Sequence, residues 1–202
     1  TANNLFAGTY TATVLDAHGC LSYSTATITE PPLLIAAIPW HTDNLCHGDQ
    51  MGTAYVDVQG GIPNYQYAWS PAGGTNATAV GMGAGNYTVI ITDVHGCTTK
   101  QLVQVTEPPQ LMMTVNTPPT ICIGQSTDIT ANVWGGTPPY NYSWNNGPVD
   151  STQNVNPDTT TSYNVKVTDA NGCTVPAQTI TVVVFPELQL NASGPPGVCS
   201  GT

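Results

Sequence analysis

The sequence predicts an all-β protein built from tandem sandwich repeats. Two observations carry this prediction: a period of about 77 residues that runs along the chain, and short segments in which apolar and polar residues alternate. The cysteines show the period most clearly, since consecutive members of two interleaved ladders lie 76 or 77 residues apart. The ladders are Cys20, Cys97 and Cys173, and Cys46, Cys122 and Cys199. Such copying argues against an enzyme, because a single active site does not need to be repeated.

Three further motifs recur with the same period. They are Thr-Glu-Pro-Pro at 29–32 and 106–109, a Gly-Gly-x-Pro-x-Tyr-x-Tyr-x-Trp type segment at 60–69 and 135–144, and a segment ending in Gly-Cys at 8–20, 85–97 and 161–173. We therefore expect four divisions of a longer polymer. They are the C-terminal part of one repeat at 1–32, complete repeats at 33–109 and 110–187, and the start of a further repeat at 188–202.

Composition narrows the range of partners. The chain holds 2 Lys and Arg against 12 Asp and Glu, a net charge of −10, so we expect no nucleic-acid partner, because phosphate binding needs basic side chains. The longest apolar runs, 33–38 and 182–185, are far shorter than the roughly 20 residues of a membrane span, so no membrane insertion is expected. Regularly spaced cysteines in small β repeats indicate disulfides and an oxidising compartment.

The repeat at 110–187 is the clearest guide to the strands. Alternating segments at 129–133, 140–144, 163–167 and 180–184 each predict a strand with one buried and one wet face. An opening strand near 111–116 and a weak one near 152–156 bring the number to six or seven. That number, with turn residues between the strands, is typical of an immunoglobulin-like β-sandwich.

Repeated aromatic residues fit the core of such a sandwich. Trp69 and Trp144 lie in the middle of predicted strands, where one bulky ring would fill the core. Tyr10, Tyr87 and Tyr163 open the penultimate strand, the position of a tyrosine corner. We therefore predict that Trp69, Trp144, Tyr87 and Tyr163 are core residues.

The hairpin before the last strand has the pattern Asp-x-His/Asn-Gly-Cys. His18 and His95 are replaced by Asn171 in the third copy, and both residue types tolerate a left-handed backbone. We therefore expect His18 and His95 to serve the turn rather than catalysis. The short Glu-Pro-Pro connections predict stiff junctions and a rod-like chain, because proline restricts the backbone.

Together these motifs resemble the SprB repeat, with the last complete repeat drifting toward a PKD-like sandwich. The resemblance rests on Cys-x-Gly, Gly-Gly-x-Pro-x-Tyr-x-Tyr-x-Trp, Gly-x-Tyr-x-Val-x-Val-Thr-Asp-x-x-Gly-Cys and Thr-Glu-Pro-Pro, and it covers essentially the whole chain. SprB repeats occur in very large surface adhesins of Bacteroidota, including gliding-motility adhesins. The resemblance implies export by the type IX system, an extracellular or cell-surface location, a stalk or filament role, and no catalytic residues.

The cysteines allow two disulfide schemes. Pairing within repeats would join Cys46 to Cys97 and Cys122 to Cys173. In an immunoglobulin-like sandwich, however, the loop after the first strand and the last hairpin lie at opposite ends, roughly 20–25 Å apart. A disulfide spans a Cα separation of about 7 Å at most. We therefore favour an inter-repeat bond between Cys46 and Cys173, and expect partners outside this sequence for Cys20, Cys97, Cys122 and Cys199. Loop-closure entropy does not separate the schemes, at about 4 against about 5 kcal/mol, so both stay open.

Two groups of residues could bind a metal ion, but a solvated loop and turn capping are the favoured roles. One loop holds a group of potential ligands, but the matching loop at 117–126 has a cysteine and no His or Asp, so a solvated loop is favoured. The group is His41, Asp43, Cys46, His47 and Asp49. Calcium at Asp16, Asp93 or Asp169 is the weaker alternative to turn capping. No cofactor is expected.

The resemblance also implies O-glycosylation. Asp150-Ser151-Thr152 and Asp158-Thr159-Thr160 match the Asp-Ser/Thr pattern that Bacteroidota modify, which makes Ser151 and Thr159 candidate sites.

The predicted function is a non-catalytic stalk or filament segment of a secreted adhesin. Its partners would be neighbouring repeats of the same chain and, through sandwich edges, other copies in a filament. One alternative is a polysaccharide-binding module that uses exposed aromatic residues such as Trp40 and Tyr55. Another is an accessory stretch of a secreted enzyme.

Overall fold

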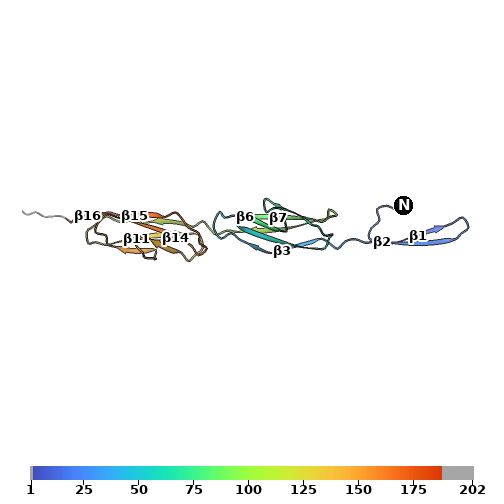
Figure 1. The fold of residues 1–202 in the computed structure, drawn as a ribbon, viewed down its shortest axis with the longest axis horizontal. Coiled ribbons are helices and arrows are strands. Elements are labelled where there is room, and N and C mark those ends of the chain that lie inside the picture. The colour runs from blue at the N-terminus through green and yellow to red at the C-terminus, as the bar shows by residue number, and fades with distance from the viewer. Residues whose placement is uncertain (1, 188–202) are drawn as a thin grey trace, which may run out of the picture. The chain divides into compact units, whose positions relative to one another are not determined.

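The computed structural model describes residues 2–187, and within that range all regular secondary structure is β (Figure 1). The chain divides into two compact units. Unit 1 runs to Asn44 and resumes at Asp49–Thr106, and unit 2 comprises Leu45–Gly48 and the chain from Glu107 onward. The predicted start of a further repeat at 188–202, with Cys199, lies outside the described residues. No helix within residues 2–187 has the length and hydropathy to cross a membrane.

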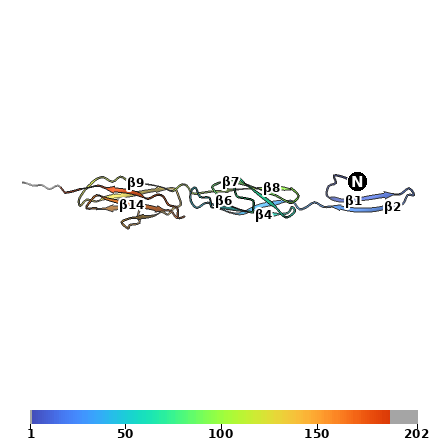
Figure 2. The ribbon, with the colours of Figure 1, turned by 45° about the horizontal axis from the view of Figure 1, so that its top comes forward.

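Unit 1 contains a hairpin and a six-stranded sandwich. The hairpin joins β1 (Gly8–Leu15) to β2 (Leu21–Ile28). The sandwich strands are β3 (Ile35–Thr42), β4 (Gly52–Gln59), β5 (Gln66–Ser70), β6 (Thr78–Met82), β7 (Gly85–Thr92) and β8 (Thr98–Val105). They form antiparallel sheets in the orders β3-β4-β6 and β5-β7-β8. In Figure 2, β7 and β8 lie along one side of this sandwich and β4 and β6 along the other.

Unit 2 is a second sandwich. Its strands are β9 (Met112–Val115), β10 (Ile121–Cys122), β11 (Thr127–Trp134), β12 (Asn141–Trp144), β13 (Thr152–Val155), β14 (Thr161–Thr168), β15 (Gln178–Val182) and β16 (Val184–Phe185). The sheets have the orders β13-β11-β9 and β12-β14-β15, and β10 pairs with β16 in parallel. The prediction of tandem immunoglobulin-like sandwiches is confirmed.

Alternation along the strands builds each core. In β14, Tyr163, Val165 and Val167 are buried, whereas Asn164 and Lys166 between them are exposed. Successive strand side chains point to opposite faces, so one face of each sheet meets its partner sheet and the other meets water. The apolar cluster of each unit draws side chains from both of its sheets, as expected for a sandwich.

One tryptophan is buried in each sandwich. The indole Nε1 of Trp69 donates a hydrogen bond to the Asn76 carbonyl at 2.9 Å, and that of Trp144 donates to the Asp150 carbonyl at 2.9 Å. The ring therefore fills the core while its N–H stays satisfied, which a buried tryptophan requires.

The tyrosines that open the penultimate strands are also placed by their hydroxyl groups. Tyr87 donates to the Gly83 carbonyl at 3.1 Å and Tyr10 to the Phe6 carbonyl at 2.9 Å, each four residues upstream. This is the backward bond of a tyrosine corner. Tyr163 is buried in the same position, and desolvation raises the pKa of its phenol.

Candidate functional site: a loop held by a disulfide

Three of the repeated motifs meet in the same way in both units. In unit 2, Gly136 N–H donates to the Pro109 carbonyl at 2.7 Å and Thr137 N–H to Asp169 Oδ2 at 2.9 Å. In unit 1 the same bonds join Gly61 to Pro32 and Ile62 to Asp93, at 2.7 and 3.0 Å. The Glu-Pro-Pro segment, the Gly-Gly turn and the Asp-x-x-Gly-Cys hairpin are therefore parts of one hydrogen-bonded cluster.

The aspartate of the hairpin organises the turn. Asp169 is 2% exposed, and its Oδ1 accepts hydrogen bonds from the backbone N–H groups of Asn171 and Cys173, both at 2.9 Å. Asp93 Oδ1 accepts the same two bonds from His95 and Cys97. The Ile62 N–H bond, followed by those from Cys97 and His95, lowers the pKa of Asp93. The carboxylate is thus held in its charged form by backbone donors.

The histidines of this hairpin lie in the turn, as predicted, but not for the predicted reason. The left-handed residue is the following glycine, with φ of 84° at Gly19, 83° at Gly96 and 86° at Gly172. Left-handed tolerance therefore does not explain His18, His95 or Asn171, and that interpretation was wrong. Glycine takes the position because it alone has no Cβ to strain there.

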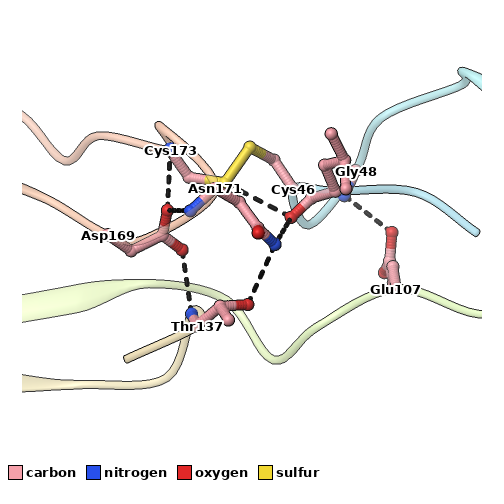
Figure 3. The surroundings of a disulfide bond; sticks show 8 residues. Cys46, Gly48, Glu107, Thr137, Asp169, Asn171 and Cys173 are labelled. Atoms are coloured by element: carbon pink, nitrogen blue, oxygen red, sulfur yellow. Dashed lines mark hydrogen bonds between the residues drawn. A yellow bond between two sulfur atoms is a disulfide. The ribbon is translucent and has the colours of Figure 1, made fainter. Parts of the chain in front are cut away.

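Unit 2 contains a segment that the sequence places between two strands of unit 1. Leu45–Gly48 follows β3 and precedes β4, yet it belongs to the second unit. A disulfide fixes it, joining Cys46 to Cys173 of the hairpin across 127 residues, with their Cα atoms 5.7 Å apart (Figure 3). That separation is within the normal range for a disulfide.

Hydrogen bonds hold the backbone of the segment on either side of the disulfide. Before Cys46, the Leu45 carbonyl accepts from Asn171 Nδ2 at 2.8 Å. After it, Gly48 N–H donates to Glu107 Oε2 at 2.7 Å (Figure 3). His47 Nδ1 lies 2.8 Å from Glu107 Oε1. The segment, which we call the docked loop (Leu45–Gly48), is therefore held by a side-chain amide, a carboxylate and a covalent bond.

The remaining cysteines are separate from this site. Cys20, Cys97 and Cys122 are free and exposed in the described part of the chain. Because Cys46 and Cys173 are bonded to each other, neither local pair of the alternative scheme is present. The bond that is present is the inter-repeat pair favoured from the sequence.

The residues considered as metal ligands have other partners. Asp43 Oδ1 accepts the Thr106 N–H at 2.7 Å, which lowers the pKa of Asp43, and His41 Nε2 lies 3.8 Å away from it. Cys46 is oxidised and His47 pairs with Glu107. Across residues 2–187, three or more His, Cys, Asp or Glu side chains are nowhere grouped as metal ligands would be.

The candidate surface sites are placed as follows. Ser151 and Thr159 are both exposed. Trp40 and Tyr55 lie opposite each other on β3 and β4, with ring centroids 5.7 Å apart and planes at 17°. Trp40 is 48% exposed, so the stacked pair offers an aromatic face to solvent.

The sequence did not identify two groups that hold the docked loop. Glu107 was attributed to a stiff linker and Asn171 to a turn, whereas both bind loop backbone. The only signal for Glu107 was its recurrence as Glu30 in the copied Thr-Glu-Pro-Pro. The sequence also did not identify Asn44, which is 3% exposed. Its Oδ1 accepts hydrogen bonds from the N–H groups of Met51 and Gly52, and its Nδ2 donates to the Met82 carbonyl. These bonds fix the backbone where the loop begins.

Comparison with protein families gives one match. Residues 41–74 and 114–149 match the SprB repeat, which includes the docked loop in the first stretch and the Gly-Gly turn in the second. No curated protein sequence is detectably similar to the chain. The SprB match and the disulfide fit a structural segment of an extracellular or surface protein.

Solved structures align with this chain at low sequence identity. The N-terminal domains of the outer capsid protein Hoc of bacteriophage RB49 align at 17% identity and a TM-score of 0.46, over 75% of this chain and 59% of that one. The eight N-terminal immunoglobulin domains of Down Syndrome Cell Adhesion Molecule align at 14% identity and a TM-score of 0.46, over 88% and 28%.

Proposed function

From the SprB repeats that two stretches of this chain match, we propose that it is a load-bearing segment in the stalk or filament of a large cell-surface adhesin. Export by the type IX system and a source in the Bacteroidota belong to the same proposal. The role is mechanical, and the chain would hold a binding region away from the cell as a stiff rod.

The observation that carries the proposal is the position of the disulfide in the sequence. The Cys46–Cys173 bond encloses β4 to β14, that is, most strands of both sandwiches. A pull on the two ends of the chain is then transmitted through the sulfur–sulfur bond rather than through the enclosed strands. Those strands stay folded under tension, and the chain does not lengthen by the segment that they form.

Force spectroscopy on single molecules tests this mechanical role. The two cysteines are 127 positions apart in the sequence, which corresponds to about 420–460 Å of extended chain at roughly 3.3–3.6 Å per residue. We expect full unfolding under reducing conditions to release that additional length, and oxidised molecules to lack it. Equal contour lengths in both conditions would contradict the proposal. The Cys122→Ser variant, which leaves the bond intact, serves as the control.

A second function, polysaccharide binding, is favoured by one observation. The Trp40 ring is 48% exposed and stacks on the half-buried Tyr55, so it offers solvent an apolar surface with a polar edge, which suits the face of a sugar ring. A glycan array probed with the chain and with Trp40→Ala tests it. Binding that disappears in the variant would support this role, and an array without signal would eliminate it.

Glycosylation is a separate proposal. Ser151 and Thr159 are exposed and follow aspartates, so both are accessible to a sugar transferase. We expect peptides containing either residue, isolated from the native source, to carry added hexose-type mass. Unmodified masses would dispose of it.

A further inference from the structure

Unit 1 repeats the loop-binding site of unit 2 without a loop in it. Cys97 ends an Asp-x-x-Gly-Cys hairpin, as Cys173 does. Glu30 precedes two prolines, as Glu107 does. His95 occupies the hairpin position of Asn171. In unit 2 those three positions form the disulfide and bind the loop backbone on both sides. In unit 1 the Cys97 thiol is free and exposed.

A cavity marks the same place. It has a volume of about 260 Å³ and is lined by Glu30, Leu34, Gly61, Cys97 and Thr98, among others. The corresponding hollow of unit 2, about 250 Å³, is walled in part by Cys46 and His47 of the docked loop. In unit 1 the cavity lining also includes Pro32, Gly61 and Asp93, which the hydrogen bonds of the Gly-Gly turn hold together. The same bonds are present in unit 2, so the turn that supports the receiving surface is already formed in unit 1.

We propose that Glu30, His95 and Cys97 form a second docking site, which takes an apolar-Cys-x-Gly loop of a repeat that comes earlier in the same polypeptide. This inference rests on the proposed function, since it extends the same cross-link to another junction. The Glu30 carboxylate accepts the N–H of the incoming glycine, and the His95 imidazole donates to the carbonyl before the incoming cysteine. Cys97 completes the disulfide.

Three copies in this chain define the sequence pattern of the loop that would dock. An apolar-Cys-x-Gly sequence occurs three times at the repeat period, as Leu-Cys-His-Gly at 45–48, Ile-Cys-Ile-Gly at 121–124 and Val-Cys-Ser-Gly at 198–201. Glycine suits this position because the backbone there is left-handed, with a φ of 81° at both Gly48 and Gly124. The N–H of Gly48 is the donor that Glu107 accepts in the occupied site. The residue between Cys and Gly varies, which fits a site that binds mainly backbone.

The covalent step is a thiol–disulfide exchange. The Cys97 thiolate attacks the sulfur of an incoming cysteine that is already bonded to a small disulfide donor. The new sulfur–sulfur bond forms as the old one breaks, and the donor leaves as a thiolate that takes up a proton. The donor is the oxidant, so electrons balance.

A peptide of residues 41–51, activated at its cysteine as the mixed disulfide with thionitrobenzoate, tests the site on the full 202-residue chain. Each bond formed releases one thionitrobenzoate, and peptide mapping identifies the labelled cysteine. We expect Cys97 to react about tenfold faster than Cys20, which has the same Asp-x-His-Gly-Cys turn but no preceding Glu-Pro-Pro in this chain. In denaturant the two rates should become similar.

Matched variants separate docking from simple exposure. Glu30→Gln should remove most of the preference for Cys97, whereas Glu107→Gln should leave it unchanged. A peptide with sarcosine in place of Gly48 lacks that N–H. On the wild-type chain it should react with Cys97 no faster than with Cys20. Equal labelling of Cys97 and Cys20 in the native chain, no effect of Glu30→Gln, or a Cys97–Cys97 dimer forming in preference to the adduct would each overturn the proposal. The force experiment reports only on Cys46–Cys173, so either proposal can fail alone.

Discussion

At the residue scale, the hairpin aspartate does more than cap a turn. Asp169 accepts three backbone hydrogen bonds, two from its own hairpin and one from Thr137 of the Gly-Gly turn. It therefore couples the turn that presents Cys173 to the segment that packs against Pro109. A carboxylate is needed because only acceptors can face three N–H groups.

We predict that Asp169→Asn destabilises unit 2 by about 1–3 kcal/mol, because the new amide N–H₂ would face a backbone donor that loses its acceptor. Chemical denaturation followed by hydrogen exchange of unit 2 peptides measures the loss. Asp158→Asn, at an exposed position of the same unit, should change stability by less than about 0.5 kcal/mol. Equal effects of the two variants would contradict the assigned role.

Acid should weaken unit 1 in a defined direction. Backbone donors lower the pKa of Asp93 below its unfolded value of about 3.9, so the unfolded chain binds its proton first as the pH falls. The stabilisation from this group is therefore present above about pH 4 and is lost at lower pH. Unfolding midpoints of unit 1 between pH 7 and pH 3 should fall less steeply in Asp93→Asn. A variant profile parallel to that of the wild type would refute this.

At the element scale, the Gly-Gly turn is the most constrained connection. Gly135 has a φ of 72°, and a Cβ there would collide with the Gln110 carbonyl. Its own carbonyl accepts the Tyr140 hydroxyl at 2.6 Å, so the turn cannot move away without losing that bond. Gly135 is therefore required by the close approach of another backbone segment. At Gly136, also left-handed, a Cβ would instead meet the Asp169 carboxylate and the Leu111 side chain.

Gly135→Ala should cost about 2–5 kcal/mol, the sum of a left-handed backbone and a forced backbone shift. Gly172→Ala is the matched control, because its φ of 86° is also left-handed but its added Cβ would meet nothing within 4 Å. We expect only about 1–2 kcal/mol there. Thermal or urea unfolding of the two variants measures the difference, and equal losses would show that steric contact is unimportant.

At the scale of the whole molecule, the disulfide joins one loop to a unit other than that of its sequence neighbours. Leu45–Gly48 belongs to unit 2 although its neighbours in sequence on both sides belong to unit 1. The repeat boundaries seen in the sequence and the compact units of the structure therefore differ at this loop. Through the Cys46–Cys173 disulfide, this loop covalently joins the predicted repeat at 33–109 to the predicted repeat at 110–187.

Removing this bond should destabilise the chain by about 2–5 kcal/mol, because the unfolded state regains the freedom of a loop of 127 residues. Cys46→Ser, Cys173→Ser and reduction should have similar effects on the denaturation midpoint. Cys122→Ser should have almost none, since Cys122 is exposed and free. A midpoint that does not change on reduction would contradict a stabilising role.

Much of the fold follows from the sequence alone, for local reasons. Alternation at Tyr163, Val165 and Val167 specifies a strand and its buried face, and the 77-residue period specifies that this pattern is copied. The tryptophans and the proline and glycine motifs mark the core and the turns in the same way. Apart from the period, each of these signals depends on residues within one strand or one turn.

The loop-binding site depends on contacts between residues that are far apart in the sequence. The two cysteine ladders showed that Cys46 and Cys173 were a possible pair, but the topology argument could not choose firmly between that pair and the local ones. The partners Glu107 and Asn171 lie 59 and 126 residues from the loop atoms that they bind. The sequence therefore determined the strands, the core and the repetition, because alternation lies within single strands and the period follows from comparing segments of the sequence with one another. Only the tertiary structure decided where Leu45–Gly48 docks, because that requires two segments more than a hundred residues apart to lie within bonding distance.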